Sequence, residues 1–482
     1  MGYQGPVWSA RHHLREIYAA LDAARSYPEW LEAAEALDEQ TGAAAWRAED
    51  DSPRYDAEAL RQSMQAMERL RRESDALGLA RHLTEDLYRH LNDLTAPELY
   101  QRAMAGPKHL VERYLDKAES SLRWLAGVPS MPPTVLLERF EAAWRVFGRS
   151  ALMLSGGATW GFHHLGVVKA LFGLGLLPSI LSGASTGAMI AAGVCTRSDP
   201  ELADLFADPD QMRLDGLVPV ALSRAIQQGA LLDPARLRAV LHHNLGSQTF
   251  AEAHAHSGRV LNISVSPVRH RQKPRLLTHL TAPDVLVTSA VLASSALPGL
   301  FPPVVLEHRD ADGHVQPYIH DERWVDGSIS GDLPKRRLSR LHNVNHFIVS
   351  QTNPHVLPFV RHHARPGIGP VITGLLSATV RSHGAWAMDL ARRLSRSDRV
   401  EQAATALRSV LDQEYRGDID IHPQLRWDLA RRVVANPTRR ELAAFILEGE
   451  RSVWPHVALI RDQTRIGRAF RACVAQLQSA IP

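Results

Sequence analysis

The sequence is poor in cysteine: only Cys195 and Cys473 occur among 482 residues. Both lie in apolar surroundings, so we expect two buried thiols rather than a disulfide, which fits a reducing compartment. The 24 histidines are scattered, and no Cys, His or Asp spacing typical of a metal site stands out. The sequence therefore predicts neither a disulfide framework nor a bound metal or other cofactor.

The sequence also has little net charge and few long apolar runs. The formal net charge is +3, too small to indicate nucleic-acid binding, and no nucleic-acid-binding motif occurs. Residues 1–11 lack the apolar region of a signal peptide, which predicts a cytoplasmic protein. The uncharged stretch 285–306 is long enough to suggest a membrane span, but Pro298, Pro302 and Pro303 interrupt it. We expect that stretch to meet lipid without spanning it.

The length predicts two or three domains. Apolar residues recur at helical spacing through residues 1–145, which predicts an N-terminal helical domain. Residues 146–352 alternate apparent strands and helices, the pattern of an α/β domain with a mostly parallel sheet. Residues 353–482 return to a helical and basic pattern, so we expect a C-terminal helical region.

Within these regions the apolar periodicity predicts individual elements. In the first region we expect helices over 23–40, 56–77, 79–91 and 97–125. In the second we expect strands over 151–154, 261–265 and 346–350, the last closing the sheet, and helices over 162–177 and 284–296. In the third we expect a short strand near 415–421, a helix over 439–448 and an amphipathic basic helix over Arg381–Arg399. The basic face of that last helix is either solvated, which we favour, or lies on an anionic membrane.

One pentapeptide carries the strongest chemical signal. Residues Gly183 to Gly187 read G-x-S-x-G, and they lie between the apolar pair Ile180-Leu181 and a run of small residues that predicts a helix. A strand, a sharp turn and a helix in this order expose the serine hydroxyl at the top of a sheet. The helix N-terminus would favour a developing oxyanion. Ser185 is therefore a candidate nucleophile, although a structural turn is an equally good interpretation of the motif alone.

A glycine loop precedes this motif. Residues 151–154 predict a buried strand that runs into the loop from Gly156 to Gly161, and a helix follows. The glycine spacing fits neither a dinucleotide-binding loop nor a P-loop. An oxyanion hole for Ser185 is the better interpretation, built from the backbone N–H groups of Gly156 and Gly157, with Ala158 as a third donor.

A third motif follows near residue 326. The pair Asp326-Gly327 comes directly after Trp324-Val325, which indicates a strand that ends in a turn. For a lone Asp-Gly pair, a simple turn would be the more common explanation.

In this order, the glycine loop, the G-x-S-x-G motif and the Asp-Gly pair resemble the patatin-like phospholipase family. Trp160 stands where the general family has a basic residue, and Ala158 takes the place of its third glycine. An aromatic residue at the former place is typical of the triacylglycerol lipase branch, known from yeast lipid droplets and plant oil seeds. Further stretches similar to that branch are 147–152, 154–157, 283–285, 289–291, 296–301, 324–334 and 343–351, with Trp30, Leu37, Asp38, Trp46, Tyr55, Asp56, Leu99, Tyr100 and Lys108 in the N-terminal region.

The resemblance implies a three-layer α/β/α core flanked by helical regions, and a Ser–Asp dyad without histidine. Ser185 would be the nucleophile and Asp326 its base, with Gly161, Gly183, Gly187 and Gly327 as motif glycines. The implied activity is that of a serine lipid acyl hydrolase, with triacylglycerol or phospholipid as substrate. The implied partner is a membrane or lipid-inclusion surface to which the protein binds peripherally.

Apolar residues near the three motifs would suit a fatty acyl chain. They are Trp160, Phe162, Leu297, Leu300 and Phe301. A free aspartate, with a pKa of about 3.9, is a weak base at neutral pH. Burial beside Trp324 and Val325 would raise the pKa of Asp326 and make it a stronger base.

Three alternatives stay open at this stage. A Ser-His-Asp triad would draw its histidine from four candidates, His163, His164, His342 and His346. The same dyad would also serve a lysophospholipid acyltransferase, in which a lyso-lipid replaces water. A catalytically silent lipid-surface scaffold is the third alternative, but a scaffold needs neither Ser185 nor Asp326.

Overall fold

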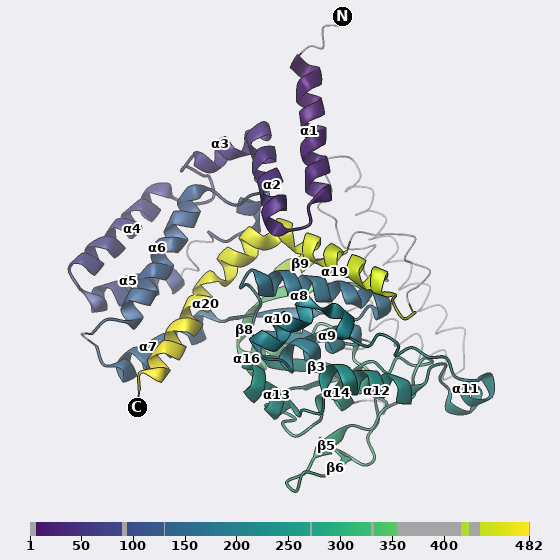
Figure 1. The fold of residues 1–482 in the computed structure, drawn as a ribbon. Coiled ribbons are helices and arrows are strands. Elements are labelled where there is room, and N and C mark those ends of the chain that lie inside the picture. The colour runs from purple at the N-terminus through teal and green to yellow at the C-terminus, as the bar shows by residue number, and fades with distance from the viewer. Residues whose placement is uncertain are drawn as a thin grey trace, which may run out of the picture. The chain divides into compact units, whose positions relative to one another are not determined.

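The computed structural model describes residues 6–88, 94–129, 131–269, 272–328, 332–353, 416–423 and 434–481. The expected basic helix over Arg381–Arg399 lies outside these residues. The chain divides into two compact units (Figure 1). The helical unit comprises 1–150, 342–345 and 451–482, and the α/β unit comprises 151–341 and 346–450. The described part of 353–482 is therefore shared between the two units, and the expected boundaries at 145 and 352 stay predictions.

The helical unit buries one apolar core, to which its last helix contributes. That helix, α20 (Val457–Ser479), packs along α6 (His109–Ala126) and α7 (Pro133–Phe147). The Phe470 ring of α20 meets the Phe140 ring edge-on, with ring centroids 5.9 Å apart. The other α-helices described in this unit are α1 (Pro6–Ala23), α2 (Tyr27–Thr41), α3 (Ala43–Ala48), α4 (Ala57–Arg72) and α5 (Ala76–Tyr88).

Two of the expected helices in this unit are wrong in extent. The helix expected over 56–77 ends at Arg72, because Ser74 takes a left-handed φ of 53° before α5 begins. The helix expected from Pro97 is only a 3₁₀ turn over Pro97–Tyr100, and α6 starts at His109. Between them, the pair Gly106-Pro107 interrupts the chain, since proline disfavours helical conformation in the residue before it.

The α/β unit is organised around a seven-stranded sheet with the order β4-β3-β2-β1-β8-β9, in which β7 also pairs with β3. The pairs β1–β2, β2–β3 and β8–β9 are parallel, whereas β4 and β7 run antiparallel to β3. The expected α/β fold with a mostly parallel sheet is therefore confirmed. The strands are β1 (Arg149–Leu154), β2 (Ile180–Gly183), β3 (Val260–Pro267), β4 (Arg275–Leu277), β7 (Trp324–Asp326), β8 (Val344–Ser350) and β9 (Ile419–Ile421).

Helices flank this sheet (Figure 1). Two of them, α9 (Thr186–Cys195) and α14 (Val287–Ser294), pack directly on β3, and their small residues permit the close approach. The remaining described helices of the unit are α8 (His163–Gly173), α10 (Asp199–Ala207), α11 (Leu222–Gln228), α12 (Pro234–Leu245), α13 (Phe250–Ser257), α16 (Lys335–His342) and α19 (Arg439–Val453). A separate hairpin consists of β5 (Glu307–Arg309) and β6 (Val315–Pro317).

The expectation that residues 346–350 close the sheet is wrong. Strand β9 pairs in parallel with β8 beyond it, with Ile348 opposite Ile419. Residues 346–350 and 419–421 lie far apart in the sequence, so nothing in the local pattern of β8 indicates this partner. The α/β fold therefore depends on a strand from beyond residue 352.

Two remaining expectations concern cysteine and membrane. Cys195 and Cys473 are both free and buried, as predicted. Among the helices of the described residues, none combines the length and the apolar character needed to cross a bilayer. The uncharged stretch 285–306 forms the short helix α14 and then a loop.

Helix α19 packs closely against α8 at Gly166, which leads to a stability prediction. A Cβ atom on Gly166 would lie 1.9 Å from the Ile446 carbonyl oxygen, whereas one on Gly173 would meet no atom within 4 Å. We expect Gly166→Val to lower the free energy of unfolding by about 3 kcal/mol or more, because the two backbones must separate. Gly173→Val, on the same helix, should change it by less than about 1 kcal/mol. Urea unfolding of both variants checks this, and equal midpoints would contradict the close crossing.

Candidate active site

Ser185 occupies a strained turn between β2 and α9. Its backbone has φ 52° and ψ −123°, a left-handed region that costs energy for a residue with a Cβ atom. A Cβ atom on Gly183 would lie 2.3 Å from the Gly187 carbonyl oxygen, and one on Gly187 would lie 2.2 Å from that of Leu154. The two motif glycines are therefore required by backbone packing, and the turn is the one that the G-x-S-x-G pattern predicts.

A hydrogen-bonded serine holds this turn in place. The Ser185 N–H donates to Ser294 Oγ at 3.0 Å, and the Ser294 hydroxyl donates to the Ser264 carbonyl at 2.8 Å. Ser294 lies on α14 and Ser264 on β3, so two neighbouring elements fix the strained residue. Sequence reasoning missed Ser294, because one serine in a helix of small residues carries no distinguishing signal.

Asp326 ends β7, beside the turn that carries Ser185. The side chain is 1% exposed, and its carboxylate accepts the Ser328 N–H at 2.8 Å. The hydroxyl groups of Ser328 and Ser185 lie near this carboxylate. Burial raises the pKa of Asp326 to about 6, against the lowering effect of the Ser328 N–H and of the two nearby hydroxyls. The fold thus brings together the two residues that the sequence singled out, because β2 and β7 both pair with β3.

The glycine loop lies against the same turn, but its donors differ from those expected. The Gly156 N–H donates to Asp332 Oδ1 at 2.8 Å, which removes it from the expected oxyanion donors. The N–H groups of Gly157 and Ala158 make no hydrogen bond to another described residue. The Ala158 carbonyl accepts the Thr186 hydroxyl at 2.8 Å, which fastens the loop to the residue after Ser185. The N–H groups of Gly157 and Ala158 therefore stay candidates for binding an oxyanion.

The other motif glycines mark close approaches of the backbone. A Cβ atom on Gly161 would lie 2.6 Å from Thr186 Cβ, and one on Gly327 would lie 2.0 Å from the Ser264 carbonyl oxygen. One on Gly157 would lie 2.2 Å from the hydroxyl oxygen of Thr352. Gly161 and Gly157 thus pack against the side chains of Thr186 and Thr352, and Gly327 packs against the backbone of β3.

A second buried carboxylate stands behind the loop. Asp332 accepts the Gly156 N–H on one oxygen and the Asn353 side-chain amide, at 2.5 Å, on the other. Burial, together with a smaller effect of the nearby Asp326 carboxylate, raises the pKa of Asp332 to about 7. Sequence reasoning included Asp332 within the stretch 324–334 but gave it no role. The feature of the sequence that could have pointed to Asp332 is its position six residues after Asp326.

Two buried histidines, His163 and His164, lie beside the loop. His164 hydrogen-bonds the Ser350 hydroxyl at 2.7 Å through Nδ1, and the Ser155 carbonyl at 3.0 Å through Nε2. Burial lowers the pKa of His164 to about 4 and that of His163 well below its ordinary value, so both rings are neutral at pH 7. His164 thus connects the ends of β1 and β8, whereas the groups nearest the Asp326 carboxylate are Ser328 and Ser185.

An apolar pocket opens at Ser185 and follows α9. Its cavity volume is about 150 Å³. Thr186, Met189, Ile190, Gly193 and Val194 line it at the spacing of one helical face. Phe162, Leu297, Leu300 and Phe301 line it as expected, whereas Trp160 does not and lies buried. The other lining residues include Leu165, Leu205, Leu217, Leu237, Val240, Leu241, Leu245 and Val434.

One wall of this pocket comes from residues 434–437, far beyond the other parts of the site. The Thr159 hydroxyl donates to the Ala435 carbonyl at 2.6 Å and accepts from its N–H at 3.0 Å. The Asn436 side chain accepts the Leu217 N–H and donates to the Leu217 carbonyl, both at 2.9 Å. This segment therefore braces the residue next to Ala158, a role that sequence reasoning missed.

Polar residues line the part of the pocket beyond the end of α9. Arg197 donates to the carbonyls of Gly193 and Asn244 at 2.8 and 2.7 Å. The Asn244 side chain in turn binds the backbone N–H and carbonyl of Arg213. These bonds pair the polar groups with one another, so the pocket offers contact chiefly to an apolar chain.

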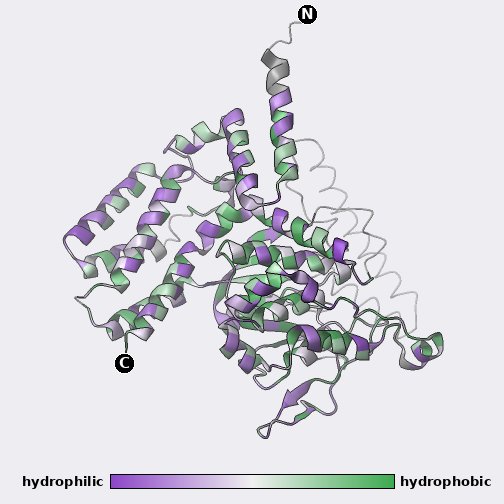
Figure 2. Cartoon of the chain, viewed as in Figure 1, coloured by the Kyte–Doolittle hydropathy of each residue, from purple (hydrophilic) through white to green (hydrophobic). Residues whose placement is uncertain are grey.

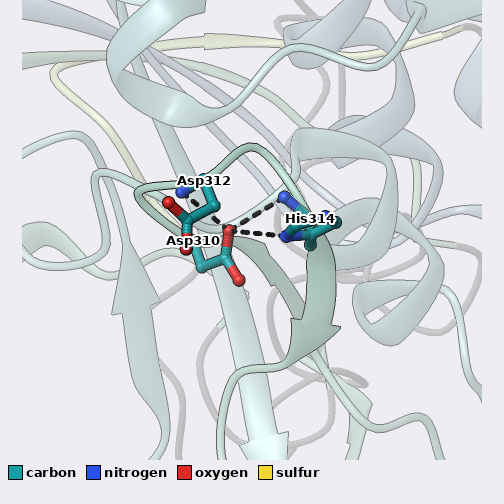
Figure 3. Close-up of side chains that lie close together, drawn as sticks. All are labelled: Asp310, Asp312 and His314. Carbon is teal, nitrogen blue, oxygen red and sulfur yellow. Dashed lines mark hydrogen bonds and ion pairs between the residues drawn. The ribbon is translucent and has the colours of Figure 1, made fainter.

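Away from this site, three side chains of the types that bind metal ions form a cluster. Asp310, Asp312 and His314 gather at the turn between β5 and β6, with ligand atoms within 4.8 Å of one another (Figure 3). One Asp310 oxygen accepts the N–H groups of Asp312 and His314 at 3.0 and 2.8 Å. The cluster is therefore accounted for as a hydrogen-bonded turn, and its residues are mostly exposed.

Comparison with known proteins identifies the family. The description "Patatin-like phospholipase" matches residues 152–336, and a "Domain of unknown function (DUF3336)" matches residues 7–144. Triacylglycerol lipase ptl3 of Schizosaccharomyces pombe is 31% identical over 488 residues, which cover 96% of this chain and 98% of that one. The chain belongs to the patatin-like phospholipase family.

Other patatin-like relatives are longer than this chain. Triacylglycerol lipase 4 of Saccharomyces cerevisiae is 33% identical over 93% of this chain and 51% of its own. Triacylglycerol lipase SDP1L of Arabidopsis thaliana is 32% identical over 99% of this chain and 59% of its own. This patatin-like chain thus spans little more than half the length of those two relatives. The crystal structure of VipD from Legionella pneumophila matches with a TM-score of 0.32 and 14% identity, over 65% of this chain and 67% of that one, too weakly to add to the assignment.

Proposed function

We propose that this patatin-like protein is a serine lipid acyl hydrolase. It transfers a fatty acyl group from a lipid ester to Ser185 and then to water. The observation that carries the proposal is the position of Ser185, which lies beside the buried Asp326 carboxylate and lines an apolar pocket. The neutral His164, bound to Ser350 and Ser155, favours the dyad over a triad that includes this histidine.

In the proposed reaction, Ser185 Oγ attacks the ester carbonyl carbon while its proton passes to Asp326. A pKa of about 6 makes Asp326 a stronger base than a free aspartate, whose pKa is about 3.9. The oxyanion faces the N–H groups of Gly157 and Ala158 and the N-terminus of α9. Asp326 then returns the proton to the departing alcohol oxygen. Water releases the acid from the acyl-enzyme by the same steps, with Asp326 accepting its proton.

The acyl chain would lie along α9. At about 1.5 Å per residue, the lining from Thr186 to Val194 spans about 12 Å. With C–C bonds of about 1.5 Å, each carbon of an extended chain adds about 1.3 Å, so about nine carbons fit along this span. The pocket continues past Val194 to Arg197 and Asn244. These dimensions favour acyl chains of more than ten carbons.

The relatives support triacylglycerol as a substrate, because three of them are named triacylglycerol lipases. Phospholipid is the second substrate that the family description names. Both lipids form insoluble phases, so we propose that the protein acts in the cytoplasm while bound peripherally to a membrane or a lipid inclusion. Acyl transfer to a lysophospholipid would use the same dyad and is distinguished by its product.

Release of fatty acid by the purified protein tests the proposal. The assay uses a triacylglycerol emulsion and phospholipid vesicles in parallel, each with and without a lysophospholipid acceptor. We expect free fatty acid from at least one lipid, and the faster reaction identifies the substrate. Formation of phospholipid from the acceptor in place of free acid would establish the acyltransferase instead. Absence of both products would overturn the enzymatic proposal.

Gly193 offers a test of where the acyl chain lies. A Cβ atom there would meet its nearest neighbours, Arg197 and Leu245, at 3.8 and 3.9 Å, which is ordinary contact. A side chain at this position is therefore tolerated and occupies space in the pocket. We expect Gly193→Leu to lower kcat/KM about tenfold or more for an ester of a 16-carbon acid and to leave a four-carbon ester within twofold. Gly193→Ala should have a smaller effect in the same direction. An equal loss for both esters would contradict this path for the chain.

A further inference from the structure

The most exposed large apolar side chains of the described residues lie on α11. Leu222 is 74% and Ile226 is 77% exposed, and they stand one helical turn apart on the same face. Leu231 is 55% exposed, and Val218 is exposed as well. Figure 1 shows α11 at the tip of an arm that projects from the α/β unit, and Figure 2 shows its hydrophobic residues there. We call residues 218–232 the apolar arm.

The base of the apolar arm is built onto the mouth of the pocket. Its two sides pair with each other, through Val220 N–H to the Leu231 carbonyl at 3.0 Å and Asp233 N–H to the Val218 carbonyl at 2.9 Å. The Leu232 N–H donates to the carbonyl of Leu300, which lines the pocket. The arm therefore has a fixed position beside the opening that leads to Ser185.

The charge of the segment agrees with an apolar environment. Residues 216–232 contain a single charged side chain, Arg224. It lies two residues from both Leu222 and Ile226, which places it on the opposite side of the helix. A short helix with one apolar face and one basic residue opposite is typical of segments that lie in a membrane interface. Exposed apolar patches of this kind mark interaction sites.

We propose that the apolar arm docks the protein on a lipid surface, with Leu222 and Ile226 inserted among the acyl chains. The inference rests on the proposed function, which requires an acyl chain to pass from an insoluble lipid into the pocket. Docking through the arm would set the pocket mouth against that lipid, because Leu217 and Leu300 at its base both line the pocket. Leu297, 39% exposed, lies at the same mouth and extends the apolar surface.

Flotation of the full chain with phosphatidylcholine-coated triacylglycerol droplets tests the proposal without a need for catalysis. The variant carries Leu222→Ser and Ile226→Ser. The matched control carries Leu280→Ser and Val315→Ser, at positions 55% and 54% exposed elsewhere in the α/β unit. We expect the arm variant to partition onto droplets at least tenfold less than the wild type, and the control to partition like the wild type. Hydrolysis of a dissolved short-chain ester should stay within twofold in both, since neither pair lines the pocket.

Several outcomes would overturn the docking surface. One is flotation of the arm variant like the wild type, and another is an equal loss of droplet binding in the control. Sedimentation could instead reveal a wild-type dimer that the arm variant breaks while droplet binding is unchanged, which would assign the arm to a second copy of the chain. Loss of flotation in the arm variant alone, in a protein without esterase activity, would support docking while the proposed function fails.

Discussion

Replacement of Ser185 by Ala, or of Asp326 by Asn, is expected to lower kcat/KM for a dissolved short-chain ester by about 10⁴-fold or more. Without the Ser185 hydroxyl no acyl-enzyme forms, and without the Asp326 carboxylate no base accepts its proton. The two losses should be far from additive in the double variant, because the residues act as a unit. Residual activity within tenfold of the wild type in either single variant would contradict the dyad.

Stability measurements separate this loss of activity from misfolding. Ser185 has a φ of 52°, which glycine adopts without strain, so Ser185→Gly should unfold at a higher urea concentration than Ser185→Ala. For Asp326, burial raises the pKa to about 6, above the unfolded value of about 3.9. Between these values the native state binds more protons than the unfolded state, so this group's contribution to stability falls as pH rises through that window. Asp326→Asn, which stays neutral, should therefore be no less stable than the wild type at pH 8.

The pH dependence of catalysis follows from the same group. Asp326 must be ionised to accept the Ser185 proton, and its pKa is raised to about 6 by burial. We expect kcat/KM for a dissolved ester to fall below about pH 6 with the slope of one proton. If kcat/KM fell only near pH 4, where a free carboxyl group titrates, Asp326 would not be a base whose pKa is raised by burial.

Replacement of Asp332 by Ala is the second change for which we expect a large effect, a loss of about 10²-fold in kcat with little change in KM. Asp332 holds the Gly156 N–H, and Gly157 and Ala158 follow directly in the chain. Loss of this anchor displaces the two oxyanion donors, and one such donor is worth about 10²–10³-fold in kcat in a serine hydrolase. Because the donors act on the transition state, the loss should fall on kcat rather than on KM.

Asp332→Asn supplies the control for this prediction. The amide oxygen can still accept the Gly156 N–H, so we expect activity within about tenfold of the wild type. With a pKa of about 7, Asp332 is mostly protonated where Asp326 titrates, so the substitution should leave the acidic limb of the kcat/KM profile near pH 6. Equal losses for the two variants would contradict the anchoring of the Gly156 N–H by Asp332.

The sequence alone predicts the parts of the site whose signal is local. Gly183 and Gly187 are recognisable because the turn tolerates no side chain at either place. The Asp326-Gly327 pair indicates a strand end, and only the family resemblance gave Asp326 its role. The sheet around them follows from apolar runs such as 151–154 and 261–265. In each case the pattern of neighbouring residues reflects the packing that those residues experience.

The missed parts depend on contacts between segments far apart in the chain. The Gly156 N–H was expected to face the oxyanion, and only the folded position of Asp332 assigns it elsewhere. Strand β9 pairs with β8 although the two are far apart in the sequence. Ala435 holds Thr159 through a backbone carbonyl, a contact that any residue type at 435 could make. A backbone contact of this kind places no demand on the side chain, so the sequence carries no signal for it.

The most direct test is covalent labelling with a fluorophosphonate that carries a long alkyl chain, followed by mass spectrometry of the protein and its peptides. One adduct per chain on Ser185, absent from Ser185→Ala and much slower in Asp326→Asn, is the predicted result. Slower labelling by the same reagent in Gly193→Leu would place its alkyl chain along α9. An adduct on another serine, or equal labelling of Ser185→Ala, would contradict Ser185 as the nucleophile.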